Sequence, residues 1–184
     1  MKKSVKHEIP DELKQVPLET LVKRYVRHYR DIAPDWDAFA DAQIEGRRRA
    51  QFRFIGAGGS GKADPLAIPA SDFTLSIMRV PPGQGGSAHT HEVAEAFICL
   101  EGELTVFFED LNGKRVSAKL GQYDAVGCPP GIPHGFHNDG KVDVLMQTIV
   151  GSGKPGPVGY VDESVYAEET KRLAERKAQP VVTK

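Results

Sequence analysis

Three histidines and one glutamate have the types and spacing of metal ligands. His89 and His91 are one residue apart, Glu95 follows, and His134 comes after a Pro-Pro-Gly turn. Side chains alternate between the two faces of a strand, so the first three, which share parity, can point into one interior. Buried together without an ion, these polar groups would each need another partner. Three imidazoles and a carboxylate therefore predict a site for a borderline divalent metal.

The segments that position these residues have the alternating pattern of β-strands. Short strands separated by turns indicate an antiparallel sandwich or barrel. Asn112-Gly113 predicts a tight hairpin of type I′, which needs positive φ at both central positions. The alternating stretches are residues 51–54, 73–78, 104–108, 116–120 and 142–150.

Helical patterns precede and follow the predicted strands. A helix is expected from Pro17 until residues 31–34, with a short second helix from Pro34 through Phe39. The first helix has an apolar stripe, which is expected to be buried against the outside of the β-domain or against a partner subunit. The stripe consists of Leu18, Leu21, Val22, Tyr25, Val26 and Tyr29.

A closing helix is predicted from Asp162 or Ser164 to about Gln179. The chain is thereby divided into three parts. Residues 1–48 form a helical extension, 49–158 a β-barrel, and 159–184 a C-terminal helix and tail.

Residues 56–62 (Gly-Ala-Gly-Gly-Ser-Gly-Lys) imitate nucleotide-binding motifs. Such glycine turns bind phosphate only where they open a helix whose N-terminal amides face the ligand. Pro65 and Pro69 follow closely and forbid that helix. A flexible loop near the mouth of the barrel is the better interpretation.

The spacing of the metal ligands resembles a known family. Gly83, His89, His91, Glu95 and Gly102 match every defined position of the first motif of the cupin superfamily. The second motif is matched at Pro129, Gly131, His134 and Asn138.

The second motif departs at its opening glycine. Tyr123 stands in that place, with Gly121 two residues earlier. This departure affects the turn entering the strand and no ligand. The resemblance, over residues 73–150, implies a double-stranded β-helix, or jelly-roll barrel, in a monocupin. It makes His89, His91, Glu95 and His134 the ligands and implies a homodimer.

One divalent ion per chain is expected. Four donors leave about two adjacent positions open on an octahedral ion, and Fe(II) is favoured, although Mn(II), Ni(II), Co(II) and Zn(II) also fit. A redox-capable ion with two open positions suits an Fe(II)-dependent dioxygenase whose substrate is a small aromatic or dicarbonyl compound. The alternatives are a redox-neutral isomerase or lyase and a non-catalytic cupin that binds a small molecule.

Strand parity selects the residues that should line the substrate pocket. Phe97 and Cys99 share parity with Glu95, and Phe136 shares parity with His134. Gln147 is the odd polar residue of its strand and is a candidate for the pocket and for catalysis. His137 is the other catalytic candidate, although its parity is opposite to that of His134.

Composition excludes several partners. A formal net charge of −1 gives no attraction to nucleic acid or to an anionic membrane. Residues 47–49, a run of three arginines, are expected to form a solvated or interface surface. No apolar run follows the basic start, so a secretory signal is not expected. Cys99 and Cys128 do not make a disulfide framework, and a cytoplasmic protein is predicted.

Overall fold

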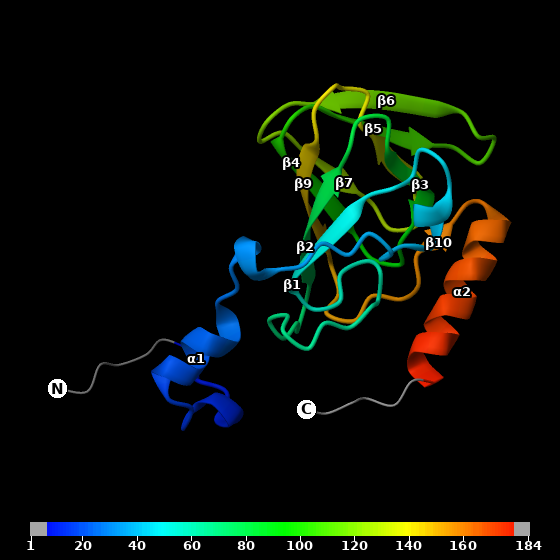
Figure 1. Cartoon of the computed structure of the whole chain (residues 1–184). Helices are drawn as coiled ribbons and strands as arrows, with labels where there is room; N and C mark the ends of the chain where they lie inside the picture. Colours follow the sequence, from blue (N-terminus) through cyan, green and yellow to red (C-terminus); the bar gives the residue numbers. More distant parts are fainter. Residues whose placement is uncertain (1–6, 179–184) are drawn as a thin grey trace.

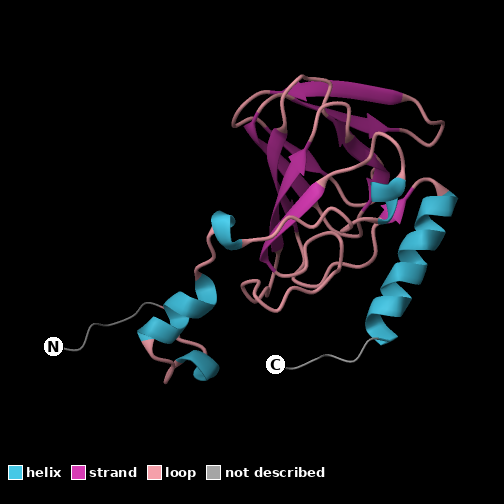
Figure 2. Ribbon diagram, viewed as in Figure 1, coloured by secondary structure: helices cyan, strands magenta, loops and turns pink. Residues whose placement is uncertain are grey.

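Two antiparallel sheets form the body of the protein (Figures 1 and 2). The computed structural model describes residues 7–178, and within them each sheet has five strands. The first sheet has the order β1 (Ala50–Ile55), β2 (Thr74–Val80), β9 (Val144–Val150), β4 (Glu95–Glu101) and β7 (Ala125–Cys128). The second has the order β10 (Gly159–Tyr160), β3 (Gly85–Thr90), β8 (His134–His137), β5 (Leu104–Glu109) and β6 (Arg115–Leu120). The predicted mainly β class is confirmed.

Alternating side chains build the core between the sheets. β2 and β9 both alternate strictly between buried and half-buried residues, and Met78 lies opposite Met146 across their antiparallel pairing. Each strand therefore gives one face to the interior, as its sequence period requires. Other buried members of the same cluster come from both sheets and include Phe97, Leu104, Val106 and Phe136.

The hairpin between β5 and β6 differs from the predicted type I′ turn. Gly113 has φ of 80°, but Asn112 is not in the left-handed region. Asp110 organises the turn instead: its carbonyl accepts from the Gly113 N–H, and its carboxylate accepts from the N–H groups of Asn112 and Lys114. The hairpin itself is present where it was predicted, but the type I′ prediction was wrong.

The N-terminal segment forms shorter helices than predicted. α1 spans Leu18–Tyr25, between the short 3₁₀ turns η1 (Asp11–Leu13) and η2 (Tyr29–Asp31). Within the described residues α1 buries none of its side chains, and it extends away from the barrel in Figure 1. Of the two expected places for the stripe, the β-domain receives only Tyr29, which packs on Phe52, and burial on a partner subunit stays a prediction.

A second short helix was predicted from Pro34 through Phe39, and the structure has a turn there. Its 3₁₀ helix comes later, at η3 (Ala40–Gln43). The backbone of Asp35 forms an isolated bridge with Gln51, which holds this segment extended beside β1. Phe39 and Ala38 enter the barrel core, so residues before the strands close one end of the barrel.

α2 (Glu163–Ala178) lies beside η3 and β10 along one flank of the barrel (Figure 1). Its start was predicted correctly, because the Asp162 carboxylate accepts from the Ser164 and Val165 N–H groups as an N-cap. Gln179, its predicted end, lies outside the described residues. Among those residues no helix combines the length and apolarity that crossing a membrane requires.

The proposed division at residues 48 and 158 cuts through contacts. β10 pairs with β3 beyond the second boundary, with Tyr160 opposite His89. The three-part division stays a proposal, and parts of both flanking segments pack against the barrel.

Candidate metal centre

Three elements bring the four candidate ligands together. His89 lies on β3, and His91 follows the end of that strand. The chain then crosses to the other sheet, where Glu95 begins β4. His134 begins β8 and is directly opposite His89 in the β3–β8 pairing. The site therefore lies between the two sheets, and all four side chains are buried.

The Glu95 carboxylate is at the centre of the group. Its Oε2 lies 2.9 Å from His134 Nε2, 3.3 Å from His89 Nε2 and 3.5 Å from His91 Nε2. Donors about 2.1 Å from one ion and at right angles to each other would be about 3.0 Å apart. The three distances therefore fit neighbouring ligands of a single ion.

His89, His91 and Glu95 form a cluster that could hold a metal ion, with their ligand atoms within 4.8 Å of one another. His134 extends this cluster by its contact with Glu95, and its ring centroid is 4.5 Å from that of His89. The donor set, nitrogen with one carboxylate oxygen, is the kind that suits divalent transition metals.

The histidine tautomers also fit a cation. His89 Nδ1 lies 2.9 Å from the Ser87 carbonyl, and His134 Nδ1 lies 2.7 Å from the Ile132 carbonyl. A carbonyl only accepts, so each Nδ1 carries the proton and, in a neutral ring, each Nε2 directs a lone pair at Glu95. Lone pairs that face a carboxylate repel it unless a cation lies between them. Such carbonyl contacts are also what orient metal-bound histidines.

Electrostatics of the protein alone favour the metal-binding form of Glu95 and His91, whereas Cys128 and Glu95 outweigh burial and raise the pKa of His134 to about 10. Burial opposes ionisation of Glu95, but its contacts with His134 and His89 outweigh it and hold its pKa well below the usual range. Burial lowers the pKa of His91 to about 4, although Glu95 partly opposes this. At neutral pH, Glu95 is thus a carboxylate and His91 a neutral imidazole.

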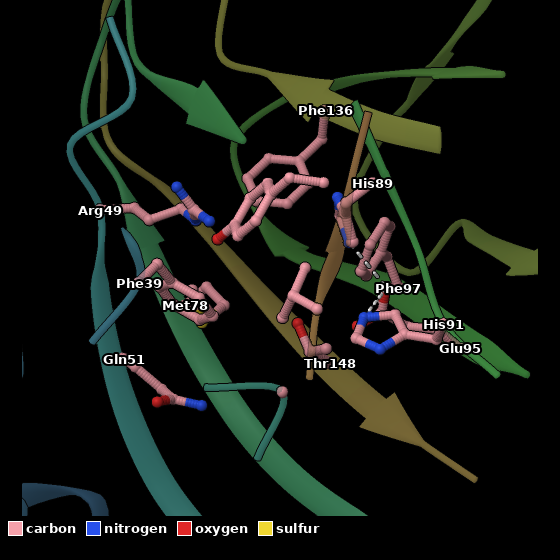
Figure 3. Close-up of a pocket in the computed structure, with 13 residues that line it drawn as sticks. Phe39, Arg49, Gln51, Met78, His89, His91, Glu95, Phe97, Phe136 and Thr148 are labelled. Carbon is pink, nitrogen blue, oxygen red and sulfur yellow. Dashed lines mark hydrogen bonds and ion pairs between the residues drawn. The ribbon is translucent and has the colours of Figure 1, made fainter. Parts of the chain in front are cut away.

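A cavity of about 30 Å³ is lined by three of the four residues, His89, His91 and Glu95 (Figure 3). Phe97 and Phe136 line it, as parity predicted, with ring centroids 5.3 Å apart and an edge-to-face arrangement. The remaining lining residues are Phe39, Arg49, Gln51, Gly59, Met78, Thr148, Val158 and Tyr160.

Three other candidates lie elsewhere. Cys99 is fully buried, and its thiol donates to the Glu101 and Gly102 carbonyls rather than lining the cavity. Gln147 is half-buried on the opposite face of β9, so its neighbour Thr148 faces the cavity instead. His137 points away from the cavity, with Nδ1 2.7 Å from the Asp139 carboxylate.

Arg49 is a cavity residue that the sequence was expected to place at the surface. It is only 3% exposed, and its Nη1 is 2.9 Å from the Asp41 carboxylate. Tyr160, beyond the predicted barrel, donates to the same carboxylate at 3.2 Å. Strand parity could have predicted this position. Arg49 directly precedes β1 and shares parity with Gln51 of that strand, and both residues are buried.

The glycine-rich segment covers the cavity. It forms no helix, and a Cβ added to Gly59 would be 3.7 Å from His91 Cε1. Ser60 holds the segment in place: its hydroxyl donates to Gln51 Oε1 at 2.6 Å, and its carbonyl accepts from Arg176 of α2 at 2.8 Å. The segment thus has the position of a lid over the candidate metal site.

Two proteins are similar to this chain in sequence. The acireductone dioxygenase of Gluconobacter oxydans (strain 621H) is 30% identical over 126 residues, which are 68% of this chain and 65% of that protein. A germin-like protein, subfamily T member 3, of Arabidopsis thaliana is 33% identical over 102 residues, 53% of this chain and 44% of that protein. The chain thus spans less than two thirds of the length of either relative.

Solved structures share the fold at low sequence identity. The polyketide cyclase RemF from Streptomyces resistomycificus superposes with a TM-score of 0.58 and 21% identity, over 83% of this chain and 95% of that one. An oxalate oxidase superposes with a TM-score of 0.55 and 15% identity, over 94% and 91%. The fold is the double-stranded β-helix of such proteins. The profile of the cupin domain family matches residues 76–150, so this part of the chain is a cupin domain.

Proposed function

We propose that this protein is an Fe(II)-dependent dioxygenase that acts on a small compound with paired oxygens. Its ligands are His89, His91, Glu95 and His134. The observation that carries the proposal is the contact of one buried carboxylate oxygen with three imidazole Nε2 atoms at 2.9–3.5 Å. Fe(II) supplies the redox capacity to activate dioxygen, and four protein ligands leave two positions for substrate and oxygen.

The chain's own residues prepare the site for such chemistry. The Ser87 and Ile132 carbonyls fix the rings of His89 and His134, so neither imidazole must reorient when an ion binds. Phe97 and Phe136 form an apolar wall that excludes water from one side of the cavity. Similarity to a protein named acireductone dioxygenase, at 30% identity, supports the reaction class.

The size of the cavity narrows the substrate. A volume of about 30 Å³ holds about two water molecules, far less than the several hundred Å³ of a usual ligand pocket. Of the two expected substrate classes, a compact dicarbonyl compound fits better than an aromatic ring. An aromatic substrate requires the lid at Gly59 to move.

Oxygen consumption after anaerobic loading with Fe(II) tests the proposal. Protein should be supplied with catechols, hydroxybenzoates, hydroxyketones and diketones in turn. We expect uptake with one of the compact dicarbonyl or hydroxyketone compounds. Turnover with Zn(II) or Ni(II) in the absence of oxygen would instead identify a redox-neutral isomerase or lyase. Thermal stabilisation by a compound that is never turned over would identify a binding protein.

We also propose that the protein is a cytoplasmic homodimer. The exposed apolar stripe of α1 supports the dimer, since Leu18 is 74% exposed and Val22 60%. Light scattering after size exclusion measures the mass directly, and Leu18→Glu with Val22→Glu should shift a dimer to monomer. A wild-type mass of one chain, 20.1 kDa, would refute the dimer.

A further inference from the structure

Two residues that line the cavity each have a buried polar atom without a partner in the described part of the chain. These atoms are Arg49 Nε and Thr148 Oγ1. Arg49 is 3% exposed and Thr148 is 8% exposed, so water does not satisfy them from outside. A buried donor without a partner destabilises the folded state, and native proteins retain few of them. Both residues line the cavity that adjoins the metal site.

The partners of Arg49 leave one edge of its guanidinium free. Its Nη1 contacts the Asp41 carboxylate at 2.9 Å, the Arg47 carbonyl at 3.0 Å and the Gly85 carbonyl at 3.2 Å. Those contacts anchor the group, and its plane lies over the ring of Phe39 at 4.2 Å. A guanidinium has five N–H donors arranged to hold a carboxylate at one edge. The edge that carries Nε is available for that purpose.

The charges around the cavity favour an anion. Arg49 and Asp41 cancel each other, and a divalent ion held by Glu95 leaves a formal charge of about +1. One monoanion neutralises that charge. Tyr160 connects the two groups: its ring centroid is 6.2 Å from that of His89, and its hydroxyl donates to Asp41, the partner of Arg49.

We propose that Arg49 and Thr148 form a carboxylate subsite, so that the substrate is a small carboxylic acid that also presents an oxygen to the metal. Arg49 Nε–H donates to the carboxylate, and the Thr148 hydroxyl donates to an oxygen on the same ligand. The inference rests on the proposed function only in taking this cavity as the substrate site. The cavity volume of about 30 Å³ limits the acid to a few heavy atoms.

Binding to Zn(II)-loaded protein tests the subsite without any oxygen chemistry. Calorimetry should compare acetate, lactate and pyruvate with acetamide, lactamide and pyruvamide, neutral analogues of nearly the same shape. We expect at least one acid to bind about 10- to 100-fold more tightly than its amide, the range for hydrogen bonds to charged groups. If no acid binds more tightly than its amide, the proposal is overturned.

Substitution of two different threonines distinguishes a role in the subsite from the general effect of removing a buried hydroxyl. Thr148→Val removes an unpartnered hydroxyl, so stability should be unchanged or higher, while acid binding weakens about 5-fold. Thr74→Val is the matched control, because Thr74 Oγ1 is also buried without a partner among the described residues but does not line the cavity. Equal effects of the two substitutions on binding would overturn the role of Thr148.

A double variant distinguishes recognition of the acid by Arg49 from recognition of the acid by the metal ion. Arg49→Met with Asp41→Asn removes both charges together and leaves neither buried alone. With Zn(II) stoichiometry equal to wild type, its preference for the acid over the amide should fall about 10-fold or more. An unchanged preference would mean that the metal alone recognises the acid. Failure to consume oxygen after Fe(II) loading would refute the dioxygenase and leave these binding results standing.

Discussion

His134 Nε2 lies 2.9 Å from Glu95 Oε2, although 39 residues separate the two along the chain. Glu95 begins a strand of one sheet and His134 begins a strand of the other, so this contact connects the two layers of the barrel. A metal ion bound to both residues would connect the layers more strongly. Metal binding and folding stability should therefore be coupled.

Removal of single histidines tests this coupling. His91→Ala and His134→Ala should each lose stoichiometric metal, and the metal-dependent rise in melting temperature should disappear with it. His137→Ala is the control, since His137 is a histidine of similar sequence context that points away from the cavity. Metal content by mass spectrometry of the purified proteins gives the answer. Full metal content in His91→Ala would remove that residue from the ligand set.

Gly59→Ala should fill the cavity without disturbing the fold. The added methyl would lie 3.7 Å from His91 Cε1, an ordinary contact, and Gly59 is not among the residues with positive φ. Replacement of glycine at a compatible position should raise the free energy of unfolding by about 0.4–1 kcal/mol. The methyl takes much of a 30 Å³ cavity, so ligand affinity should fall at least 10-fold while metal content is retained.

Gly127→Ala is the matched control for this substitution. Gly127 is exposed on β7, and an added Cβ meets nothing within 4 Å. Chemical denaturation and calorimetry of both variants separate the backbone effect from the cavity effect. Unchanged ligand affinity in Gly59→Ala would show that the segment at Gly59 does not cover the binding site.

Periodicity predicted the strands and the inward set because both depend on local backbone geometry. The β2, β5, β6 and β9 segments were located within two residues of their observed bounds. Parity also predicted that His89, His91 and Glu95 face one interior, although the structure places His89 and Glu95 on strands of different sheets and His91 in the segment between them. The side chains still face the same interior after the chain crosses between the sheets. The local sequence pattern does not predict that crossing.

The sequence was a poorer guide to which side chains of a single strand point into the barrel. Gln147 and Thr148 are adjacent, so an error of one residue exchanges the cavity side with the outer side. Arg49 was expected in solvent because an isolated arginine is costly to bury. Its partner Asp41 makes burial affordable, and a pairing across a turn and a 3₁₀ helix cannot be read from residue spacing.

Tyr123 marks where the chain departs from the second cupin motif, and its backbone explains why that motif has glycine. Tyr123 has φ of 71°, and among the described residues it is the one non-glycine residue with positive φ. Its side chain is 74% exposed, so it gains little from packing. Tyr123→Gly should increase the free energy of unfolding by about 1 kcal/mol, since the left-handed region costs other residues about 1–2 kcal/mol.

Tyr123→Ala distinguishes backbone strain from loss of the aromatic ring. Alanine keeps the Cβ that clashes in the left-handed region, so this variant should gain nothing. Urea denaturation of wild type and both variants measures the three values. A gain in Tyr123→Ala as large as that in Tyr123→Gly would place the cause in the side chain rather than in the backbone.

Glu169 makes the docking of α2 sensitive to pH. It is 1% exposed, and within the described residues neither carboxylate oxygen has a hydrogen-bond partner. Burial raises the pKa of Glu169, Arg176 and Arg172 oppose that rise, and Asp41 adds to it. The folded protein therefore holds this proton more tightly than the unfolded chain. Stability from Glu169 is fully present below its ordinary pKa of 4.5 and is lost as pH rises through the raised value.

Glu169→Gln should consequently stabilise the protein at neutral pH. The amide carries no charge at any pH, so the gain in the free energy of unfolding is about 1–2 kcal/mol at pH 7 and shrinks as the pH approaches 4.5. Glu175→Gln, an exposed position on the same helix, controls for the change in net charge and should show no such pH-dependent gain. Denaturation curves from pH 4.5 to 8 compare the two. A stability difference between wild type and Glu169→Gln that stays constant across this range would mean that Glu169 does not titrate on folding.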